Sequence, residues 1–394
     1  MSDFNSIFDA SVVGGGIVGK TAALALARTG LRVALLARAP APLPANAAAC
    51  DGRVYAVSGG TQRLLERLRV WQALDRARLS PVYDMRVYGD AHAELHFSAF
   101  QAAVPELAWI VESSLLEGAL DTALGFHPSV EILNASAQKL RVSSDMAALE
   151  LEDGAPLKAR LVVGADGAHS WVRAQSGIPC TQREYGQTAL TAQFQAEQPH
   201  REAAYQWFRN GEIIALLPLP ENKVSLVWSA HTPHARALRA LDVPSFAAAV
   251  EQGSERRLGA LQCLSPVRGF ALALCKASRL IAPRVALVGD AAHVIHPLAG
   301  QGLNLGVRDV AALARTVAAR EPFRDPGDPV LLRRYERSRR ADIQLLMAAT
   351  DGLYRLFSWS GAVPRGVRNA GFKLVNAMPR IKRWLASYSV HAPV

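Results

Sequence analysis

Three glycines, spaced as Gly14-x-Gly16-x-x-Gly19, follow a short β-rich run and open an apolar stretch at residues 17–28. Glycine at these positions permits a tight turn, lets the backbone approach a pyrophosphate, and allows the helix to pack closely on the strand. The first N–H groups of the helix then face the phosphate charge. A second β-rich run at residues 32–36 completes a βαβ unit, so this segment predicts a dinucleotide site.

The acidic residue that usually holds the ribose hydroxyls of such a dinucleotide is missing. Its place after the second strand is taken by Ala37, and Arg38 follows. Two interpretations of these residues are open: Arg38 accommodates the 2′-phosphate of NADP, or FAD is held mainly by other contacts.

Two apolar runs later in the chain end in acidic turns that contain glycine. They are ARLVVGADG at residues 159–167 and RVALVGDAAH at residues 284–293. Each run predicts a buried strand that delivers its turn to the carboxyl edge of a sheet, where open α/β folds bind ligands.

The second of these turns carries the residues that favour a flavin. Asp290 ends a strand, and its carboxylate can accept a hydrogen bond from a ribityl chain. Gly300, Gly302 and Asn304 lead into a helix whose free N–H groups can stabilise an anion. A reduced isoalloxazine ring is such an anion, so these residues favour FAD over NADP.

Neither a metal site nor a disulfide framework is expected. His293 and His296 lie in a strand-to-helix loop rather than at the spacing of a helical zinc site. The cysteines are scattered without a CxxC spacing, which fits a reducing cytoplasm. They are Cys50, Cys180, Cys263 and Cys275.

The rest of the chain predicts a second sheet and C-terminal helices, within an α/β fold class. Residues 181–275 contain β-rich segments broken by prolines, which is typical of a mostly antiparallel sheet, and residues 81–100 have a similar character. Residues 331–357 carry a long Arg-rich amphipathic pattern. The longest uncharged stretch, residues 291–307, is too polar for a transmembrane helix, and the acidic N-terminus predicts no signal peptide.

Basic charge is concentrated at the C-terminus. The formal net charge is +10, and residues 320–394 contribute +8 of it, with 14 basic and 6 acidic side chains. From Gly352 onward there are seven Lys or Arg and no Asp or Glu. This pattern suits an anionic membrane surface or an acidic protein partner, and the alternative is a solvated basic face. No nucleic-acid motif accompanies it, so nucleic acid is not an expected partner.

The three glycine-bearing turns, taken in order, resemble the fingerprints of a known enzyme class. GxGxxG at residues 14–19, GADGAHSWVR at 164–173 and GDAAHVIHPLAGQGLNLG at 289–306 look like those of the single-component flavin-dependent aromatic hydroxylases. That class has the para-hydroxybenzoate hydroxylase fold, a Rossmann-like FAD-binding domain with an inserted, mostly antiparallel substrate sheet. An NAD(P) dehydrogenase would not be expected to carry the last two turns.

Within that class, the chain is most similar to the hydroxylases of ubiquinone biosynthesis. The segments that carry this similarity are RVYAVSGGTQRLLERLRVW at 53–71, LLPLPENKVSLVWS at 216–229 and YERSRRADIQLLMAATDGLYRLFS at 335–358. The resemblance covers nearly the whole chain.

The resemblance also implies a division of the chain. It gives a FAD-binding domain in three parts (1–80, 109–175 and 279–345), substrate-domain strands at 81–108, a β-sheet substrate domain at 176–278 and a C-terminal helical basic segment at 346–394.

The resemblance assigns the FAD diphosphate to the first turn and its flanks. Gly14, Gly16 and Gly19 would meet the diphosphate. Arg53, in the loop after the second strand, would contact the cofactor, and Arg38 stands where the ribose is bound.

The two later turns would bind the rest of the cofactor. Asp166 and Gly167 would lie near the pyrophosphate and the path of the reducing nicotinamide, and Asp290 would bind the ribityl chain. The residues that would present backbone to the isoalloxazine are Gly300, Gly302, Leu303 and Asn304.

Pro297 and His296 are the candidate catalytic residues, because the resemblance places Pro297 beside the substrate near the flavin ring. Three more residues are candidates for the substrate pocket, although aromatic residues in a β-rich domain are more often core: Tyr185, Gln187 and Trp207.

Two positions depart from the family pattern. Position 37 is Ala where Glu or Asp is usual, and Ser113 stands where Asn or Gln is expected. A lost ligand hydrogen bond is typically worth about 0.5–1.5 kcal/mol, so FAD binding is expected to be weakened rather than excluded. The same departures favour an alternative, a degenerate scaffold protein in a biosynthetic complex.

The resemblance implies an FAD-dependent monooxygenase that hydroxylates a polyprenylated phenol. NADH or NADPH would reduce the flavin, and O2 would add to give a C4a-hydroperoxide that transfers oxygen to the ring. The second enzyme hypothesis is a hydroxylase of another aromatic substrate. The expected protein is cytoplasmic, with contacts to the inner membrane face and to other ubiquinone-biosynthesis proteins through its basic C-terminus.

Overall fold

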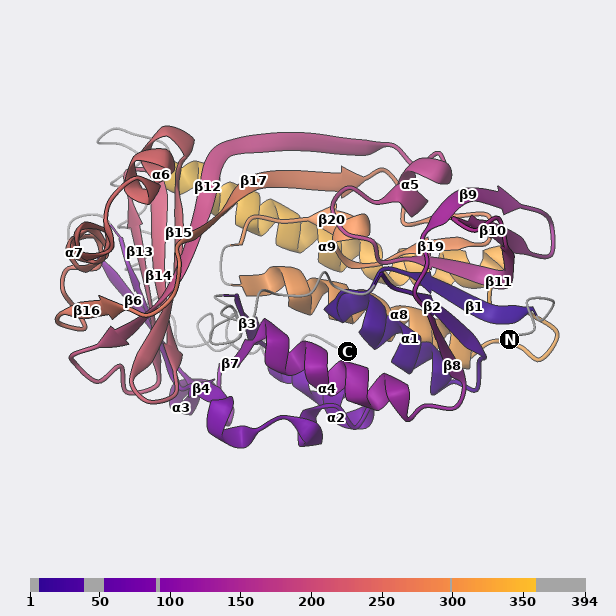
Figure 1. Cartoon of the computed structure of the whole chain (residues 1–394), viewed down its shortest axis with the longest axis horizontal. Coiled ribbons are helices and arrows are strands. Elements are labelled where there is room, and N and C mark those ends of the chain that lie inside the picture. The colour runs from indigo at the N-terminus through magenta and orange to yellow at the C-terminus, as the bar shows by residue number, and fades with distance from the viewer. Residues whose placement is uncertain (1–6, 39–52, 90–92, 298–299, 359–394) are drawn as a thin grey trace.

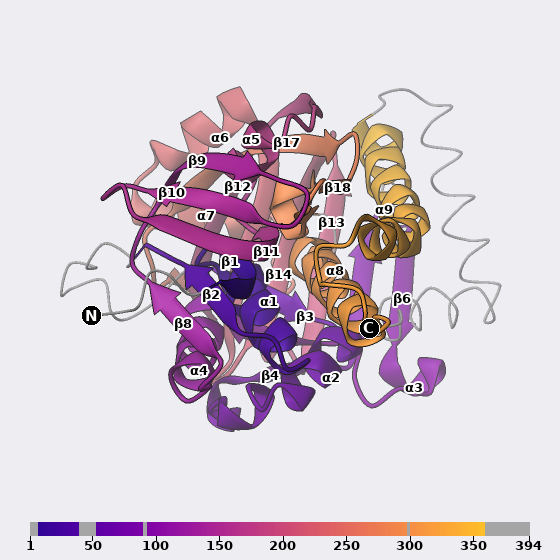
Figure 2. The same cartoon turned by 90° about the vertical axis from the view of Figure 1, so that its right-hand side faces the viewer.

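The computed structural model describes residues 7–38, 53–89, 93–297 and 300–358. Its first strand, β1 (Phe8–Val13), lies in the middle of a sheet whose central strands are parallel. β1 pairs in parallel with β2 (Val33–Leu36) on one side and β11 (Pro156–Gly164) on the other. The sheet is completed by β8 (Val130–Leu133), β9 (Ala137–Val142), β10 (Ala147–Leu151), β18 (Ile281–Ala282) and β19 (Val285–Leu287). Figure 2 shows β9, β10, β11, β1, β2 and β8 following one another across this layer.

Continuous apolar runs explain why these strands form the interior of the sheet. All four residues of β2 are buried, as are Val162 and Val163 of β11. Strands covered on both faces read as unbroken hydrophobic runs rather than alternating ones. Sequence segments far apart in the chain therefore meet in one sheet, and each central strand ends at the same edge.

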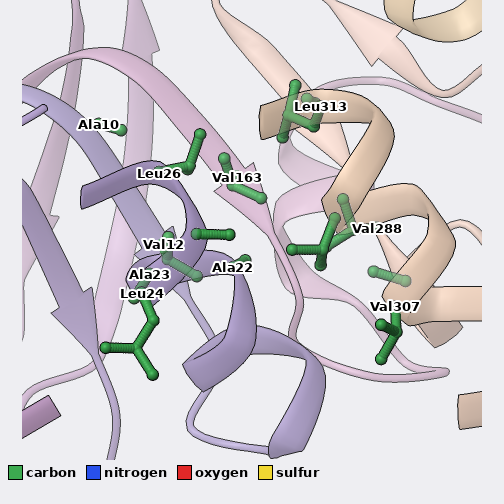
Figure 3. Packing of buried hydrophobic residues seen from close by; sticks show 14 of the residues in the cluster. Ala10, Val12, Ala22, Ala23, Leu24, Leu26, Val163, Val288, Val307 and Leu313 are labelled. Atoms are coloured by element: carbon green, nitrogen blue, oxygen red, sulfur yellow. The ribbon is translucent and has the colours of Figure 1, made fainter. Parts of the chain in front are cut away.

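Helices cover this sheet and pack against one another. α1 (Ile17–Ala27) contacts both α4 (Ser113–Gly125) and α8 (Gln301–Ala318), and α8 contacts the long helix α9 (Pro329–Ser358). Figure 3 shows Ala22 and Leu26 of α1 close to Val12 and Val163 of the sheet, with Val307 of α8 nearby.

A second, nine-stranded sheet lies at the other end of the molecule (Figure 1). All of its pairings are antiparallel except the parallel pair of β13 with β5. Its members are β5 (Asp84–Tyr88), β6 (Glu94–Ser98), β12 (Cys180–Ala196), β13 (Ala203–Arg209), β14 (Glu212–Leu219), β15 (Lys223–His231), β16 (Leu261–Cys263), β17 (Arg268–Ala277) and β20 (His293–Val294). Its core includes Phe194, Trp207 and Phe246.

Smaller elements connect and cover these layers. A three-stranded sheet contains β3 (Val54–Val57), β4 (Ser80–Val82) and β7 (Ala108–Glu112). The remaining α-helices are α2 (Gly59–Arg67), α3 (Ala99–Ala102), α5 (Trp171–Gln175), α6 (Thr232–Arg239) and α7 (Val243–Gly253). Within the described residues there are also 3₁₀ turns at η2 (Trp71–Ala73), η3 (Arg76–Arg78) and η5 (Gly289–Ala291).

β12 and β17 join the two large sheets. β12 has 17 residues, which at about 3.3 Å each gives a strand of about 55 Å. Paired with β17, it runs from the side of α5 to the nine-stranded sheet (Figure 1). α9 also extends from one sheet to the other, since Tyr335 hydrogen-bonds Leu287 of β19 and Phe357 stacks on Phe208 of β13.

The expected α/β fold class, with a parallel sheet, an antiparallel sheet and C-terminal helices, is confirmed. The amphipathic pattern at residues 331–357 lies within α9. The proposed division into domains stays a prediction, and most of its last segment, residues 359–394, lies outside the described residues. Among the described helices, none combines the length and the apolarity that a membrane crossing requires.

The expectation of no disulfide is wrong for one pair of cysteines. Cys180 of β12 and Cys275 of β17 form a disulfide, with Cα atoms 6.3 Å apart. The cause is strand register, because Cys180 faces Ala277 and Cys275 faces Gln182 across the antiparallel ladder. The spacing of cysteines along the chain carries no information about that register.

Candidate active site

A single cavity of about 1480 Å³ is lined by residues of both large sheets and of the helices between them. Ligand pockets for small molecules typically measure about 300–1000 Å³, so this cavity has room for a dinucleotide and a second ligand. It receives all three glycine-bearing turns: Gly14 and Gly16 from the first, Asp166 and Gly167 from the second, and Asp290 from the third.

The first turn leaves the N-terminus of α1 open to the cavity. α1 begins at the N-cap residue Gly16 with no side-chain cap and no acidic residue in its first turn. A Cβ atom at Gly16 would meet no protein atom within 4 Å. The uncapped N–H groups and the space beside them fit an anionic diphosphate.

Gly14 and Gly19 serve the packing of this turn. Gly14 has φ +129°, and a Cβ there would lie 2.2 Å from the carbonyl oxygen of Ala165. A Cβ at Gly19 would lie 1.9 Å from the carbonyl oxygen of Gly14, and Gly19 is not among the residues that line the cavity. Glycine is therefore required at both positions for strand and helix to approach each other.

The Asp166 carboxylate holds the second turn in shape. It accepts hydrogen bonds from Ser170 Oγ at 2.5 Å and from the backbone N–H of Val172 at 2.9 Å, at the start of α5. Gly167, with φ +81°, follows it on the cavity wall. Asp166 thus orders the backbone that faces the cavity, and its predicted place near the pyrophosphate stays a prediction.

Buried Arg173 ties the second turn to the third. Its guanidinium donates to the carbonyl oxygens of Ala168 and Ala291, each at 2.8 Å. Ala291 directly follows Asp290, so the two acidic turns are fixed relative to each other.

The Asp290 side chain is exposed, and it lies on the cavity wall in a turn that Gly289 makes with φ +61°. Surrounding protein raises the pKa of its carboxyl through desolvation, and electrostatic interactions with His293 and Arg53 oppose that shift. Arg53 also lines the cavity, where its guanidinium lies 5.0 Å from the ring centre of Phe270.

The helix α8 begins at the same wall. Gly300 (φ +63°), Gly302 and Leu303 line the cavity at its first turn. Asn304 does not line it. Its side chain is fully buried, accepts from Ser58 N at 3.0 Å and Thr61 Oγ1 at 2.8 Å, and donates to Ala56 O at 2.8 Å. Asn304 therefore fixes α8 to the β3–α2 connection.

The ribose end of the site lacks an acidic side chain at position 37. Arg38 lines the cavity and pairs with the exposed Glu152. Ser113 is buried, donates to Glu117 Oε1 at 2.8 Å, and is not part of the cavity wall. Arg38 therefore contributes positive charge to this end of the cavity.

The half of the cavity beyond these turns is apolar. Its lining comes from β5, β6, β13, β14 and the end of α9 and includes Val87, Leu95, Phe97, Phe208, Ile213 and Phe357. Leu353 and Leu356 of α9 extend this lining. The amphipathic pattern of α9 predicts a packed helix but carries no signal that its last turns line a cavity.

Pro297 and His296 both line the cavity next to the Asp290 turn. Gln187 donates to Gly211 O at 2.7 Å, which fixes its amide so that its Oε1 accepts from His296 Nε2 at 3.1 Å. Desolvation by burial lowers the pKa of His296 to about 4, against the opposing charge of Asp351. His296 is therefore neutral at physiological pH, with its proton on Nε2.

The other candidate pocket residues lie behind the wall. Tyr185 and Gln187 contact His296 without lining the cavity, the Tyr185 ring edge-to-face at 4.9 Å. Trp207 is wrong as a pocket residue, because it is buried in the nine-stranded sheet between Tyr88 and Tyr205. Its neighbours on β13, Gln206 and Phe208, line the cavity instead.

Known proteins resemble this chain over most of its length. Residues 8–350 match the family model described as an FAD binding domain. The chain is 40% identical to the ubiquinone hydroxylase UbiL of Rhodospirillum rubrum, over 96% of this chain and 88% of that one. It is 34% identical to the 3-demethoxyubiquinol 3-hydroxylase of Escherichia coli, over 98% and 99%.

A solved structure shares the fold. The p-nitrophenol 4-monooxygenase PnpA of Pseudomonas putida superposes with a TM-score of 0.78 at 20% identity, covering 96% of each chain. At that identity the likeness shows the arrangement of sheets and helices.

Proposed function

The chain belongs to the FAD-binding family of flavin-dependent monooxygenases, and on this premise we propose that it hydroxylates a polyprenylated phenol in ubiquinone biosynthesis. One observation carries the proposal. The three glycine-bearing turns reach one cavity whose remaining half is apolar. FAD fits the first half, because an uncapped helix N-terminus, a glycine cradle and a carboxyl lie along it.

Each turn has a separate binding task. The α1 N–H groups beside Gly16 hold the diphosphate, and Arg38 and Arg53 add positive charge along the same wall. Asp290 hydrogen-bonds the ribityl chain. The first turn of α8, at Gly302 and Leu303, presents backbone N–H groups and the positive end of the helix dipole to the ring.

Bound FAD supplies the oxygen chemistry, with NAD(P)H as the reductant and O2 as the oxygen source. The protein aligns the phenol and keeps water away from the reacting atoms. Pro297 closes the wall beside the Asp290 turn, and neutral His296 behind it adds no positive charge to that region.

The apolar half of the cavity supports a substrate with a hydrocarbon tail. Side chains from four strands and from α9 line it, among them Leu95, Phe97 and Phe357. Burial of apolar area contributes about 25 cal/mol per Å², so each prenyl unit seated there strengthens binding. A hydroxylase of a small, soluble phenol would have no use for this half.

We place the protein in the cytoplasm, on the inner face of the membrane and beside other enzymes of the same pathway. The support is the C-terminal charge, with seven basic and no acidic residues from Gly352 onward. Binding to vesicles that contain anionic lipid, lost in 1 M salt, would support this placement, and salt-independent or absent binding would contradict it.

Product analysis tests the function directly. Purified enzyme is incubated with NAD(P)H, O2 and a prenylated phenol, and mass spectrometry should find one added oxygen atom in the phenol. A protein that binds FAD but leaves the prenylated phenol unchanged and oxidises a short phenol instead would favour the other hydroxylase reading. A colourless protein that binds no FAD would favour the scaffold reading, to which Ala37 and Ser113 point.

A further inference from the structure

Asp309 of α8 contacts both ends of the turn that carries Asp290. Its carboxylate is fully buried and is not part of the cavity wall. Oδ2 accepts hydrogen bonds from the backbone N–H of Gly289 at 3.0 Å and from His293 Nε2 at 2.6 Å. Asp290 lies between these two donors in the chain, so one oxygen atom fixes the residue before it and a residue after it.

The second oxygen of Asp309 connects the turn to α9. Oδ1 accepts from Arg339 Nε at 2.7 Å, and Arg339 also donates from Nη1 to Asp342 at 2.7 Å. Burial opposes ionisation of Asp309, but His293 and Arg339 hold its pKa below the usual range. The carboxylate is therefore charged, and its bonds to the turn are charge-assisted.

Close packing places α8 directly against the same turn. A Cβ at Gly306 would lie 3.0 Å from the Cα of Gly289, so α8 approaches the turn to backbone contact. Asp309 lies one helical turn further along α8, where its side chain reaches the same backbone. A ligand-binding carboxyl has to be held within about 0.5 Å to bind well, and this arrangement supplies that rigidity.

We propose that Asp309 is a positioning residue for the cofactor, which sets the place of Asp290 through Gly289 and His293 and fixes that turn to α9 through Arg339. The inference rests on the proposed function in that FAD is the ligand of Asp290. The same helix α9 lines the apolar half of the cavity with Leu353, about 21 Å along the helix from Arg339. The buried carboxylate of Asp309 thus joins the turn that carries Asp290 to α9, the helix that lines the apolar half of the cavity.

Two variants separate this role from general stability. Asp309→Asn removes the negative charge that binds the turn. Its amide N–H₂ group also lies beside one of the groups that donate to Asp309, so that hydrogen bond is lost. Asp342→Asn is the matched control, because Asp342 also pairs with Arg339 and with Arg308, whereas Gly289 N and His293 Nε2 of the turn donate to Asp309. Both variants are expected to unfold at lower temperature.

The readout is FAD affinity, measured by flavin fluorescence during titration of apoprotein. Asp309→Asn should weaken FAD binding on the order of tenfold to a hundredfold, and Asp342→Asn by less than about threefold. At FAD saturation, the visible absorption band of Asp309→Asn should shift towards that of free FAD, while that of Asp342→Asn should match the wild type.

A third variant, His293→Phe, tests the proposal if Asp309→Asn does not fold. His293→Phe keeps an aromatic ring, although a somewhat larger one, removes the donor to Asp309 and leaves both partners of the Asp309–Arg339 pair in place. It should weaken FAD binding severalfold. Wild-type FAD affinity and spectrum in His293→Phe, or equal affinities of the two Asp→Asn variants, would overturn the inference. A wild-type apoprotein with no affinity for FAD would instead contradict the proposed function.

Discussion

Arg173 donates a hydrogen bond from Nη1 to the carbonyl oxygen of Ala291 at 2.8 Å, across 118 residues of chain. This bond joins the turn that contains Asp166 to the turn that contains Asp290. Both turns line the cavity, and this buried guanidinium links them beyond the strand pairing of β11 with β19 that precedes them.

Loss of that guanidinium should lower both stability and FAD affinity. Arg173→Gln leaves the Ala168 and Ala291 carbonyls without their donor, and we expect a loss of about 3 kcal/mol in the free energy of unfolding in urea. Arg279→Gln is the control, because the exposed Arg279 also donates to a carbonyl, that of Gly177, outside the cavity. Equal losses of unfolding free energy and of FAD affinity in the two variants would show that the bond from Arg173 to Ala291 contributes to neither property.

Gly14 and Gly16 should respond differently to the same added methyl group. Gly14→Ala forces a Cβ to 2.2 Å from a backbone oxygen at φ +129°, so we expect a loss of more than about 3 kcal/mol in stability. Gly16→Ala meets no protein atom, and its stability should fall by less than about 1 kcal/mol.

FAD titration separates the second case from a packing effect. The new Cβ in Gly16→Ala points into the space assigned to the diphosphate, so FAD affinity should fall at least about tenfold while the fold is kept. Gly118→Ala, in α4 and equally open, is the control for adding a methyl group. Undiminished FAD binding by Gly16→Ala would place the diphosphate elsewhere.

His296 should make stability depend on pH between about 4 and 6.5. Burial lowers its pKa to about 4 in the folded chain, against an ordinary value of 6.5, so the unfolded chain binds the proton first as pH falls. Stability from this group is complete above pH 6.5 and decreases towards pH 4. Between pH 7.5 and pH 5 the loss is about 2 kcal/mol.

Urea unfolding of wild type and His296→Gln at the two pH values measures this term. The variant should lose about 2 kcal/mol less than the wild type on acidification. The same pH dependence in both proteins would mean that the histidine is not held neutral by burial.

A negative charge in the last turns of α9 should raise KM for phenols with a prenyl tail and leave KM for phenols without a tail unchanged. Leu353 lines the apolar half of the cavity and is 44% exposed, so Leu353→Asp is tolerated by the fold. We expect KM for a prenylated phenol to rise about tenfold or more, because a carboxylate then lies where the tail is bound. The KM for a phenol without a tail should stay the same.

The matched control for this substitution lies on the same helix. Leu345 is 50% exposed and does not line the cavity, so Leu345→Asp should leave both KM values unchanged. If both variants behave alike, the tail does not lie along α9.

The disulfide predicts a linked peptide pair. Digestion without reductant should yield Cys180 and Cys275 in one cross-linked product, which separates after reduction, while Cys263 is recovered as a free thiol. Separate thiol peptides from all three positions in freshly prepared protein would show that the pair is reduced in solution.

The three turns could be predicted from the sequence because glycine and acidic residues after apolar strands have few other uses. The contacts that fix them could not. Arg173 reaches Ala291, Asn304 reaches Ser58, and Asp309 reaches Gly289, and each contact depends on the packing of elements distant in the chain. The motif assigns the backbone of Asn304 to the ring, which stays a prediction, and it carries no sign that the side chain connects α8 to β3 and α2 behind the cavity wall.

The individual residues that line the apolar half of the cavity could not be predicted from the sequence either. Aromatic and aliphatic residues on β-strands look alike whether they face a core or a ligand, which is why Trp207 was proposed for the pocket. The register of β13 decides between the two, and it buries Trp207 among Tyr88 and Tyr205.

α9 is anchored to the parallel-sheet side in its first half and lines the apolar half of the cavity in its last turns. Arg339 and Tyr335 fasten its first half to the parallel-sheet side, while Leu353 and Phe357 meet the substrate half. We therefore predict that substitution of Leu353 or Phe357 changes the length of isoprenoid chain that is accommodated, whereas Tyr354 in the same turns stacks on His296 and hydrogen-bonds Tyr185 and so has to be kept. Chain-length preference among related enzymes should diverge there first.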